Sequence, residues 1–233
     1  NIKASYSDEL AAMVRQLAAV GIDRVAVVYL NNAFGTGGLA AVEKSAGEHG
    51  VKLLAKVALE VDGSKMAAAV EQVSKGQPQA VIVVSAGKPS IDFVDAYLKA
   101  GHHSTFYMLS VISNTQLVQV LQEKARGIVI TQVVPPPWNQ SASVARELQA
   151  RAGEAGMKEL TFSQMEGFLS AKFLVEGLKR AGKNLNRDAL VRALEDMKKH
   201  DLGGYLVELS ATKHSSGKFV DLMILGVDGK FRR

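Results

Sequence analysis

The chain has 233 residues, of which 47% are hydrophobic and 22% charged, so it is long and apolar enough to bury a core without crosslinks. Its 28 basic residues exceed the 23 acidic ones, but the two signs are interspersed, which argues against a nucleic-acid-binding face. The sequence lacks cysteine, which excludes disulfides and cysteine-ligated zinc, and no apolar run reaches the ~18 residues of a membrane span.

The first 134 residues alternate between short apolar runs and amphipathic helical patterns. The run at 24–30 is β-branched and almost continuously apolar, which is typical of a strand that is buried on both faces. Five such β–α alternations predict an α/β fold with a doubly wound parallel sheet. The predicted strands are 24–30, 52–60, 80–85, 105–109 and 127–134, and the predicted helices are 10–19, 38–49, 65–74, 89–99 and 115–124.

Three prolines followed by tryptophan, at 135–138, interrupt this alternation. Proline cannot donate to a sheet ladder, so this segment is predicted to be a stiff, extended connector. The apolar faces of the helices beyond it need a sheet that this part of the chain does not supply. The predicted elements are helices at 143–152, 163–181 and 186–197, hairpin-like β segments at 204–210 and 219–226, and a turn at 227–230.

The stretch YLNNAFGTGGLAAVEK, residues 29–44, has the spacing of a dinucleotide-binding turn at Gly35, Gly37 and Ala40. In that motif the first glycine follows the strand almost at once, whereas four residues intervene here. Glu60 lies about 25 residues on, near the position of a ribose-binding acid. Three interpretations remain open: the dinucleotide site of an NAD(P)-dependent enzyme, a turn without a ligand, and a loop that contacts a different ligand.

No other motif indicates enzymatic chemistry or a metal. The near match to a P-loop at 177–184 ends a predicted helix instead of following a strand, so Gly182 is interpreted as a helix C-cap. The five histidines lack the spacing of metal ligands, and the motifs H-E-x-x-H and G-x-S-x-G are absent. We therefore predict no catalytic residue, no metal and no cofactor.

Small, polar loops follow three of the predicted strands. In open parallel sheets, ligands bind beyond the carboxyl ends of the strands. These loops, with one aromatic ring, suit the binding of a small organic molecule, although ordinary solvated turns have the same composition. The candidate ligand-binding residues are Asn31, Asn32, Ala33, Phe34, Gly35, Ser85, Ala86, Gly87, Ser110 and Val111.

Six stretches that span nearly the whole chain point, in their order, to one family. They are SYSDE, RVAVVYLNNAFGTGGLAAVEK, QAVIVVSAG, GIVITQVVPPPW, MEGFLSAKFLVEGLKRAG and DLGGYLVELSATKHSSGKFVDLMILGVDGKF. Together they resemble the type I periplasmic solute-binding proteins of the branched-chain amino-acid (Leu/Ile/Val) ABC transporter family.

The resemblance implies two doubly wound lobes joined by hinge strands, with a ligand trapped between them. By this resemblance, residues 1–134 form the second lobe, 135–138 a hinge crossing, and 139–233 helices and strands that return to a first, incomplete lobe and the hinge. The family's N-terminal part, which forms most of the first lobe's sheet, is expected to be missing. The chain begins with Asn1 and shows no signal peptide, so we expect a processed or trimmed periplasmic product.

The resemblance also assigns the candidate loops. Phe34 falls where the amino-acid binders place a ligand-covering aromatic residue, and residues 85–87 and 110–111 fall on their other second-lobe contact loops. Those binders commonly carry an acid near the position of Val111, which pairs with the ligand's ammonium, and this loop has none. Because an unpaired buried ammonium is costly, the sequence favours a carboxylate or aromatic acid over an α-amino acid.

The implied function is that of a non-enzymatic component of an ABC importer that closes about its hinge on a small-molecule ligand. Its expected partners are this ligand and the transporter permease. Two alternatives remain: the NAD(P)-dependent enzyme, and a ligand-sensing domain of the same fold that is coupled to a regulator.

Overall fold

The computed structural model describes residues 1–232, which fold into two compact units. The large unit comprises residues 6–131 and 221–232, and the small unit comprises residues 1–5 and 132–220. The chain therefore passes from one unit to the other after residues 5, 131 and 220. No helix in the described part of the chain is long and apolar enough to cross a membrane.

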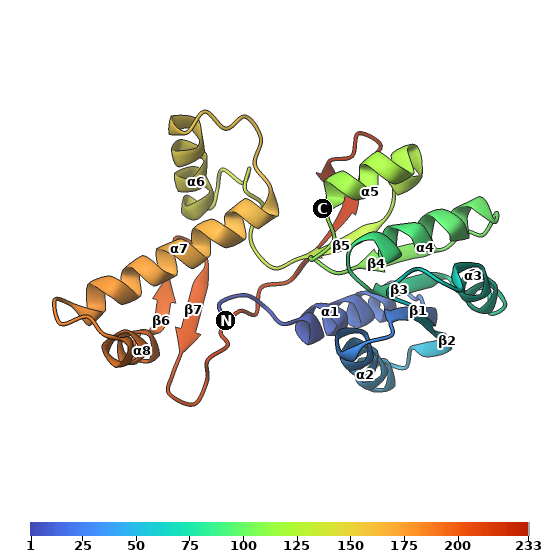
Figure 1. Cartoon of the computed structure of the whole chain (residues 1–233), viewed down its shortest axis with the longest axis horizontal. Coiled ribbons are helices and arrows are strands. Elements are labelled where there is room, and N and C mark those ends of the chain that lie inside the picture. The colour runs from blue at the N-terminus through green and yellow to red at the C-terminus, as the bar shows by residue number, and fades with distance from the viewer. Residues whose placement is uncertain (233) are drawn as a thin grey trace. The chain divides into compact units, whose positions relative to one another are not determined.

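The large unit is built on a seven-stranded sheet with the order β2-β1-β3-β4-β5-β8-β9 (Figure 1). Strands β1 to β5 pair in parallel, so the predicted doubly wound parallel sheet is confirmed. Its elements are α1 (Tyr6–Ala19), β1 (Arg24–Leu30), α2 (Ala33–His49), β2 (Lys52–Leu59), α3 (Met66–Ser74), β3 (Ala80–Val84), α4 (Lys88–Lys99), β4 (Thr105–Met108), α5 (Asn114–Leu121), the 3-10 helix η1 (Gln122–Ala125), β5 (Val129–Gln132), β8 (Asp221–Leu225) and β9 (Phe231–Arg232).

Each face of this sheet is covered by helices that supply a separate apolar core. Because alternate residues of a strand point to opposite faces, β1 contributes Val25 and Val27 to one core and Ala26 and Val28 to the other. Helices α1 and α2 pack on the first face, and α3, α4 and α5 on the second (Figure 1). All residues of β3 are buried, as its continuous apolar run predicts.

Helix α2 begins at Ala33, five residues before its predicted start at Gly38. The predicted glycine-rich turn is therefore wrong, because Gly35 lies in the first turn of the helix. Asn32 is extended, and its side-chain oxygen accepts a hydrogen bond from the backbone N–H of Gly35 at 2.9 Å. This cap satisfies one of the free N–H groups at the helix end, which lets α2 begin directly after β1 despite its glycines.

The small unit combines helices with a short antiparallel ladder. Thr161 begins α7 with a capping box, in which its hydroxyl accepts from the N–H of Gln164 and the Gln164 side chain accepts from the N–H of Thr161. Gly182, with a φ of 71°, ends the same helix, as predicted. The elements of this unit are α6 (Ser143–Glu154), α7 (Phe162–Ala181), α8 (Arg187–Glu195), β6 (Lys198–Asp201) and β7 (Leu206–Leu209).

The predicted hairpin of residues 204–210 and 219–226 is wrong. Strand β7 pairs instead with β6, whose sequence Lys-Lys-His-Asp carries no apolar alternation. Strand β8 joins the sheet of the large unit and forms a hairpin with β9. The N–H of Leu225 donates to the carbonyl of Ile128 at 2.9 Å, and β8 lies next to β5 in the sheet.

The two compact units differ from the predicted division of the chain. The boundary falls after Thr131 instead of Val134, and the first five residues belong to the small unit. Residues 221–232 complete the sheet of the large unit, in a segment that the sequence assigned to the first lobe and the hinge. The identification of these units with the lobes of a binding protein stays a prediction.

Tyr205 ties together three segments of the small unit. Its hydroxyl lies 2.9 Å from the carbonyl oxygen of Ile2 and 3.1 Å from that of Val133, and it donates to these acceptors. Burial, with a smaller contribution from the charge of Glu166, raises the pKa of Tyr205 to about 12.

We expect alkaline pH to destabilise the chain through Tyr205. Folding raises the pKa of this phenol above its unfolded value of ~10, so its contribution to stability is complete below about pH 10 and is lost as the pH rises toward 12. The loss amounts to at most ~3 kcal/mol. Urea unfolding across this pH range measures it, with Tyr205→Phe as the comparison. A decline that is equally steep in Tyr205→Phe contradicts the assignment.

Candidate functional site

The predicted loops follow three neighbouring strands of the parallel sheet. In the sheet order β1 lies beside β3, and β3 beside β4. Parallel strands end at the same edge, so the structure brings residues 31–35, 85–87 and 110–111 together at the carboxyl edge of the large unit. We call this set the carboxyl-edge loops.

The first of these loops is shorter than predicted, because Ala33, Phe34 and Gly35 belong to α2. The Asn31 side-chain amide donates to the carboxylate of Glu60, with N–O distances of 3.3 and 3.4 Å, and Asn32 caps the helix. Ala33 is exposed. The half-buried ring of Phe34 packs edge-on against Tyr6, with ring centroids 5.1 Å apart.

Gly35 is buried where α2 packs against the end of β1. A Cβ atom at this position would lie 1.9 Å from the carbonyl oxygen of Leu30, closer than any real contact. Gly37, in contrast, has no atom within 4 Å of its Cβ position. Both glycines and Ala40 lie within α2, whereas a dinucleotide-binding turn needs its first glycine before the helix. The close packing of α2 against Leu30 therefore explains why a glycine stands at position 35, without a dinucleotide.

The second loop holds two buried hydroxyl groups. Ser85 directly follows β3 and Ser90 lies in the first turn of α4, and both side chains are fully buried. Among the described residues neither hydroxyl oxygen has a hydrogen-bond partner. Ala86 is half-buried, and Gly87 is exposed with a φ of 65° and begins α4 without a side-chain cap. The left-handed backbone of Gly87 explains why a glycine stands there.

The third loop contacts a carboxyl group that sequence reasoning missed. Glu9 of α1 is fully buried, and its side chain accepts hydrogen bonds from the backbone N–H of Ser110 at 2.9 Å and from the Ser110 hydroxyl at 3.0 Å. The hydroxyl of Thr131, at the end of β5, also donates to this carboxyl group. Ser110 is half-buried and Val111 is exposed. An acid therefore lies directly beneath the loop that itself carries none.

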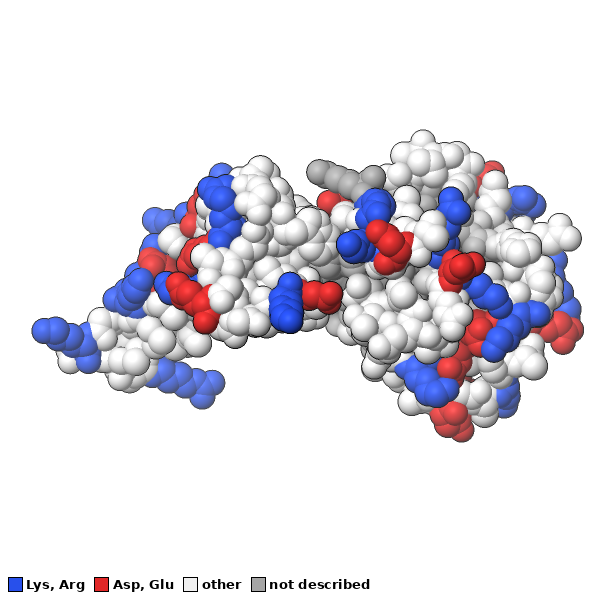
Figure 2. Space-filling model, turned by 90° about the horizontal axis from the view of Figure 1, so that it is seen from above, with Lys and Arg blue, Asp and Glu red and all other residues white. Residues whose placement is uncertain are grey.

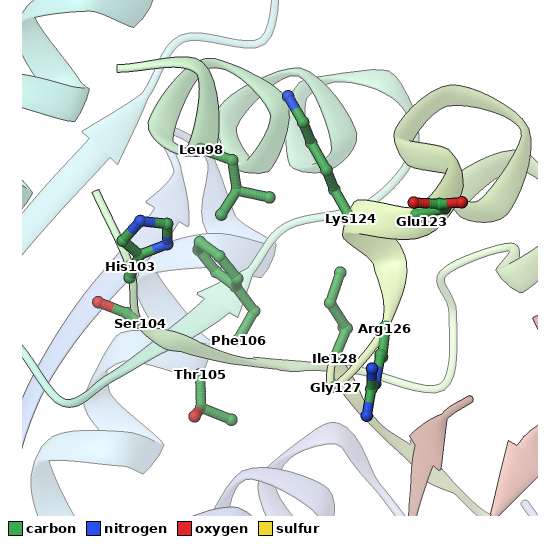
Figure 3. A pocket seen from close by; sticks show the side chains of 10 residues that line it. All are labelled: Leu98, His103, Ser104, Thr105, Phe106, Glu123, Lys124, Arg126, Gly127 and Ile128. Atoms are coloured by element: carbon green, nitrogen blue, oxygen red, sulfur yellow. The ribbon is translucent and has the colours of Figure 1, made fainter. Parts of the chain in front are cut away.

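The opposite edge of the sheet holds a cavity of about 390 Å³ (Figure 3). It is formed where β4 and β5 begin, and the side chains of Leu98, Phe106 and Ile128 point toward one another inside it. Lys124 and Arg126 lie at its rim. None of the predicted ligand-binding residues lines this cavity.

Charges are mixed over the surface. On the face that Figure 2 shows, lysine and arginine side chains alternate with aspartate and glutamate side chains. Several form ion pairs one helical turn apart, such as Lys88 with Asp92 and Lys99 with Asp95. Within residues 1–232, no cluster of three histidine or acidic side chains could hold a metal ion.

Comparison with known proteins finds similarity to periplasmic and extracellular ligand-binding proteins. A family model described as periplasmic binding protein matches residues 2–220 of this chain. An extracellular ligand-binding receptor from Verminephrobacter eiseniae superimposes with a TM-score of 0.89 at 28% identity, and a substrate-binding periplasmic protein from Ralstonia solanacearum with 0.87 at 27%. These matches cover 100% and 99% of this chain, which spans 67% and 66% of the two relatives.

A more distant match shows the fold alone. A branched-chain amino-acid ABC transporter protein from Thermus thermophilus, solved with bound valine, has a TM-score of 0.81 at 15% identity over 99% of this chain and 64% of its own. No curated protein sequence matches this chain.

Proposed function

Because the chain belongs to the periplasmic binding protein family, we propose that it binds a small organic solute and delivers it to the permease of an ABC importer. The chain spans about two thirds of the similar solved structures, so this function is proposed for the protein that contains it. Family membership implies a periplasmic or extracellular location, and we propose the periplasm. The proposal includes no catalytic step and no cofactor.

The arrangement of the carboxyl-edge loops supports this proposal. Three parallel strands end side by side, and the loops beyond them offer amide, hydroxyl and aromatic groups within one edge. Ligands of open α/β sheets bind at this edge. We propose that residues 31–35, 85–87 and 110–111 form one wall of the ligand site.

The second wall, in this proposal, comes from the other lobe, as the family resemblance implies. A ligand held by both walls stabilises the closed form, because only closure about the hinge completes its contacts. If one wall alone supplied half of the interactions, a micromolar ligand at about −8 kcal/mol would fall toward millimolar affinity. Tight binding therefore requires both lobes.

The chemistry of the loops favours a carboxylate or aromatic acid as the ligand. Residues 110–113 contain no acid, and the carboxyl group of Glu9, which contacts Ser110, is fully buried and already accepts hydrogen bonds from Ser110 and Thr131. The ammonium of an α-amino acid would lack a charged partner here, which is costly in a closed site. The bound valine of the Thermus thermophilus protein belongs to a relative with only 15% identity.

A calorimetric ligand screen of the full-length protein tests the proposal. We expect micromolar binding of at least one aromatic or aliphatic carboxylic acid, and at least tenfold weaker binding of leucine, isoleucine and valine. Tight binding of leucine would contradict the proposed ligand class. Failure of every acid and amino acid in the screen to bind would contradict solute binding itself.

A further inference from the structure

Glu9 is a buried acid beneath a proposed ligand-binding loop. It lies in the first turn of α1, one residue before the helix that the sequence predicts at 10–19. Its carboxyl group reaches Ser110, 101 residues away, and Thr131, 122 residues away. The contact with Ser110 is double, since the backbone N–H and the hydroxyl bind different carboxyl oxygens.

We propose that Glu9 is ionised and acts as a positioning residue that fixes the Ser110 hydroxyl as a hydrogen-bond acceptor toward the ligand. From this we infer the substrate class, a carboxylic acid that carries a hydroxyl group at this point. The inference rests on the proposed function, because it assumes that the loop of Ser110 contacts the solute.

The direction of the hydrogen bonds follows from the ionised state that we propose for Glu9. A carboxylate can only accept hydrogen bonds, and a serine hydroxyl has one proton to donate. The Ser110 hydroxyl donates to the Oε1 atom of Glu9, with an O–O distance of 3.0 Å, and the Ser110 N–H donates to Oε2, with an N–O distance of 2.9 Å. Only the lone pairs of the Ser110 hydroxyl remain for a ligand. The backbone contact holds the residue in this orientation.

A hydroxyl group matches these lone pairs better than a charged group does. A ligand carboxylate placed here would meet lone pairs, with the charge of Glu9 behind them. A ligand ammonium would be attracted by the same charge but would contact only the neutral Ser110 oxygen, because the fully buried Glu9 carboxylate already accepts from Ser110 and Thr131. A neutral hydroxyl needs one acceptor and places no unpaired charge in the site.

The variant Glu9→Gln reverses the polarity at one contact and keeps the shape. Its amide oxygen can accept from Thr131 and from the N–H of Ser110, as Oε2 does now. Its NH₂ group then faces the Ser110 hydroxyl and donates to it. The Ser110 hydroxyl is then free to donate its own hydrogen bond to the ligand, instead of accepting one from it.

Matched hydroxy and keto acids test this reversal on the full-length protein. We expect the wild type to bind phenyllactate about tenfold more tightly than phenylpyruvate, and hydroxyisocaproate about tenfold more tightly than ketoisocaproate. Glu9→Gln should abolish or invert this preference, and Ser110→Ala should abolish it. The control Ser113→Ala, which removes a neighbouring hydroxyl that caps α5, should keep it. An unchanged preference in Glu9→Gln and Ser110→Ala overturns the inference.

Two further outcomes separate this inference from the proposed function. If the wild type binds leucine or phenylalanine best, the inferred hydroxyl acid is wrong, while solute binding stands. If it binds none of these probes and nothing in the wider screen, the proposed function itself fails.

The state of Glu9 is also measurable without a ligand. The infrared difference spectrum of the wild type minus Glu9→Gln should contain a carboxylate band from Glu9. The C=O band of a protonated carboxyl group in its place would overturn the inference.

Discussion

Replacing Gly35 with alanine is expected to destabilise the large unit by about 3 kcal/mol or more, the largest effect of any small substitution in the carboxyl-edge loops. The new Cβ atom would lie 1.9 Å from the carbonyl oxygen and 2.6 Å from the nitrogen of Leu30. Both atoms belong to the backbone of β1, so neither can move aside as a flexible side chain can. The start of α2 must shift away from the strand.

Gly37→Ala is the matched control, two residues further along the same helix. Its Cβ position has no neighbour within 4 Å, and alanine is the better helix former, so this variant should be as stable as the wild type or gain up to ~1 kcal/mol. Urea unfolding of the two variants gives the comparison. Equal stabilities would contradict the view that Gly35 is required for packing.

Replacing Glu9 with alanine is expected to cost about 3 kcal/mol of the free energy of unfolding. The substitution removes the acceptor of the Ser110 N–H and hydroxyl, and it leaves the Thr131 hydroxyl with the carbonyl oxygen of Met108 at 3.3 Å. It also removes a link between α1 and the ends of β4 and β5. Thermal and urea unfolding measure the loss.

Glu9→Gln separates hydrogen bonding from charge in the same site. It can retain three hydrogen bonds, so we expect it to lose markedly less stability than Glu9→Ala. If both variants were as stable as the wild type, the buried contacts of Glu9 would have no structural role. If both were equally unstable, the charge of Glu9 would be what the fold requires.

The sheet could be predicted from the sequence because its strands are marked by their own composition. Strand β3 is apolar at every position and buried on both faces, so a local pattern identifies it. Strand β6, in contrast, consists of Lys-Lys-His-Asp and exists because β7 offers it a partner. The start of α2 was missed for a related reason: glycines suggest a turn, but the cap at Asn32 and the packing of Gly35 against Leu30 favour a helix.

The candidate site was predictable only in part. That loops at the carboxyl ends of β1, β3 and β4 share one edge follows from the alternation of strands and helices. The contact of Glu9 with Ser110 does not, because it joins residues 101 positions apart, and an acid in the first turn of a helix is common on electrostatic grounds alone. Asn32 was predicted as a ligand contact, yet its side-chain oxygen is already used to cap α2.

A crystal structure of the full-length protein with its tightest ligand from the screen shows whether the ligand binds at the carboxyl-edge loops. We predict that the ligand contacts the carboxyl-edge loops, with Phe34 against its apolar part and a ligand hydroxyl donating to Ser110. A ligand bound elsewhere, for example in the cavity beside Phe106 and Ile128 at the opposite edge, would contradict the account.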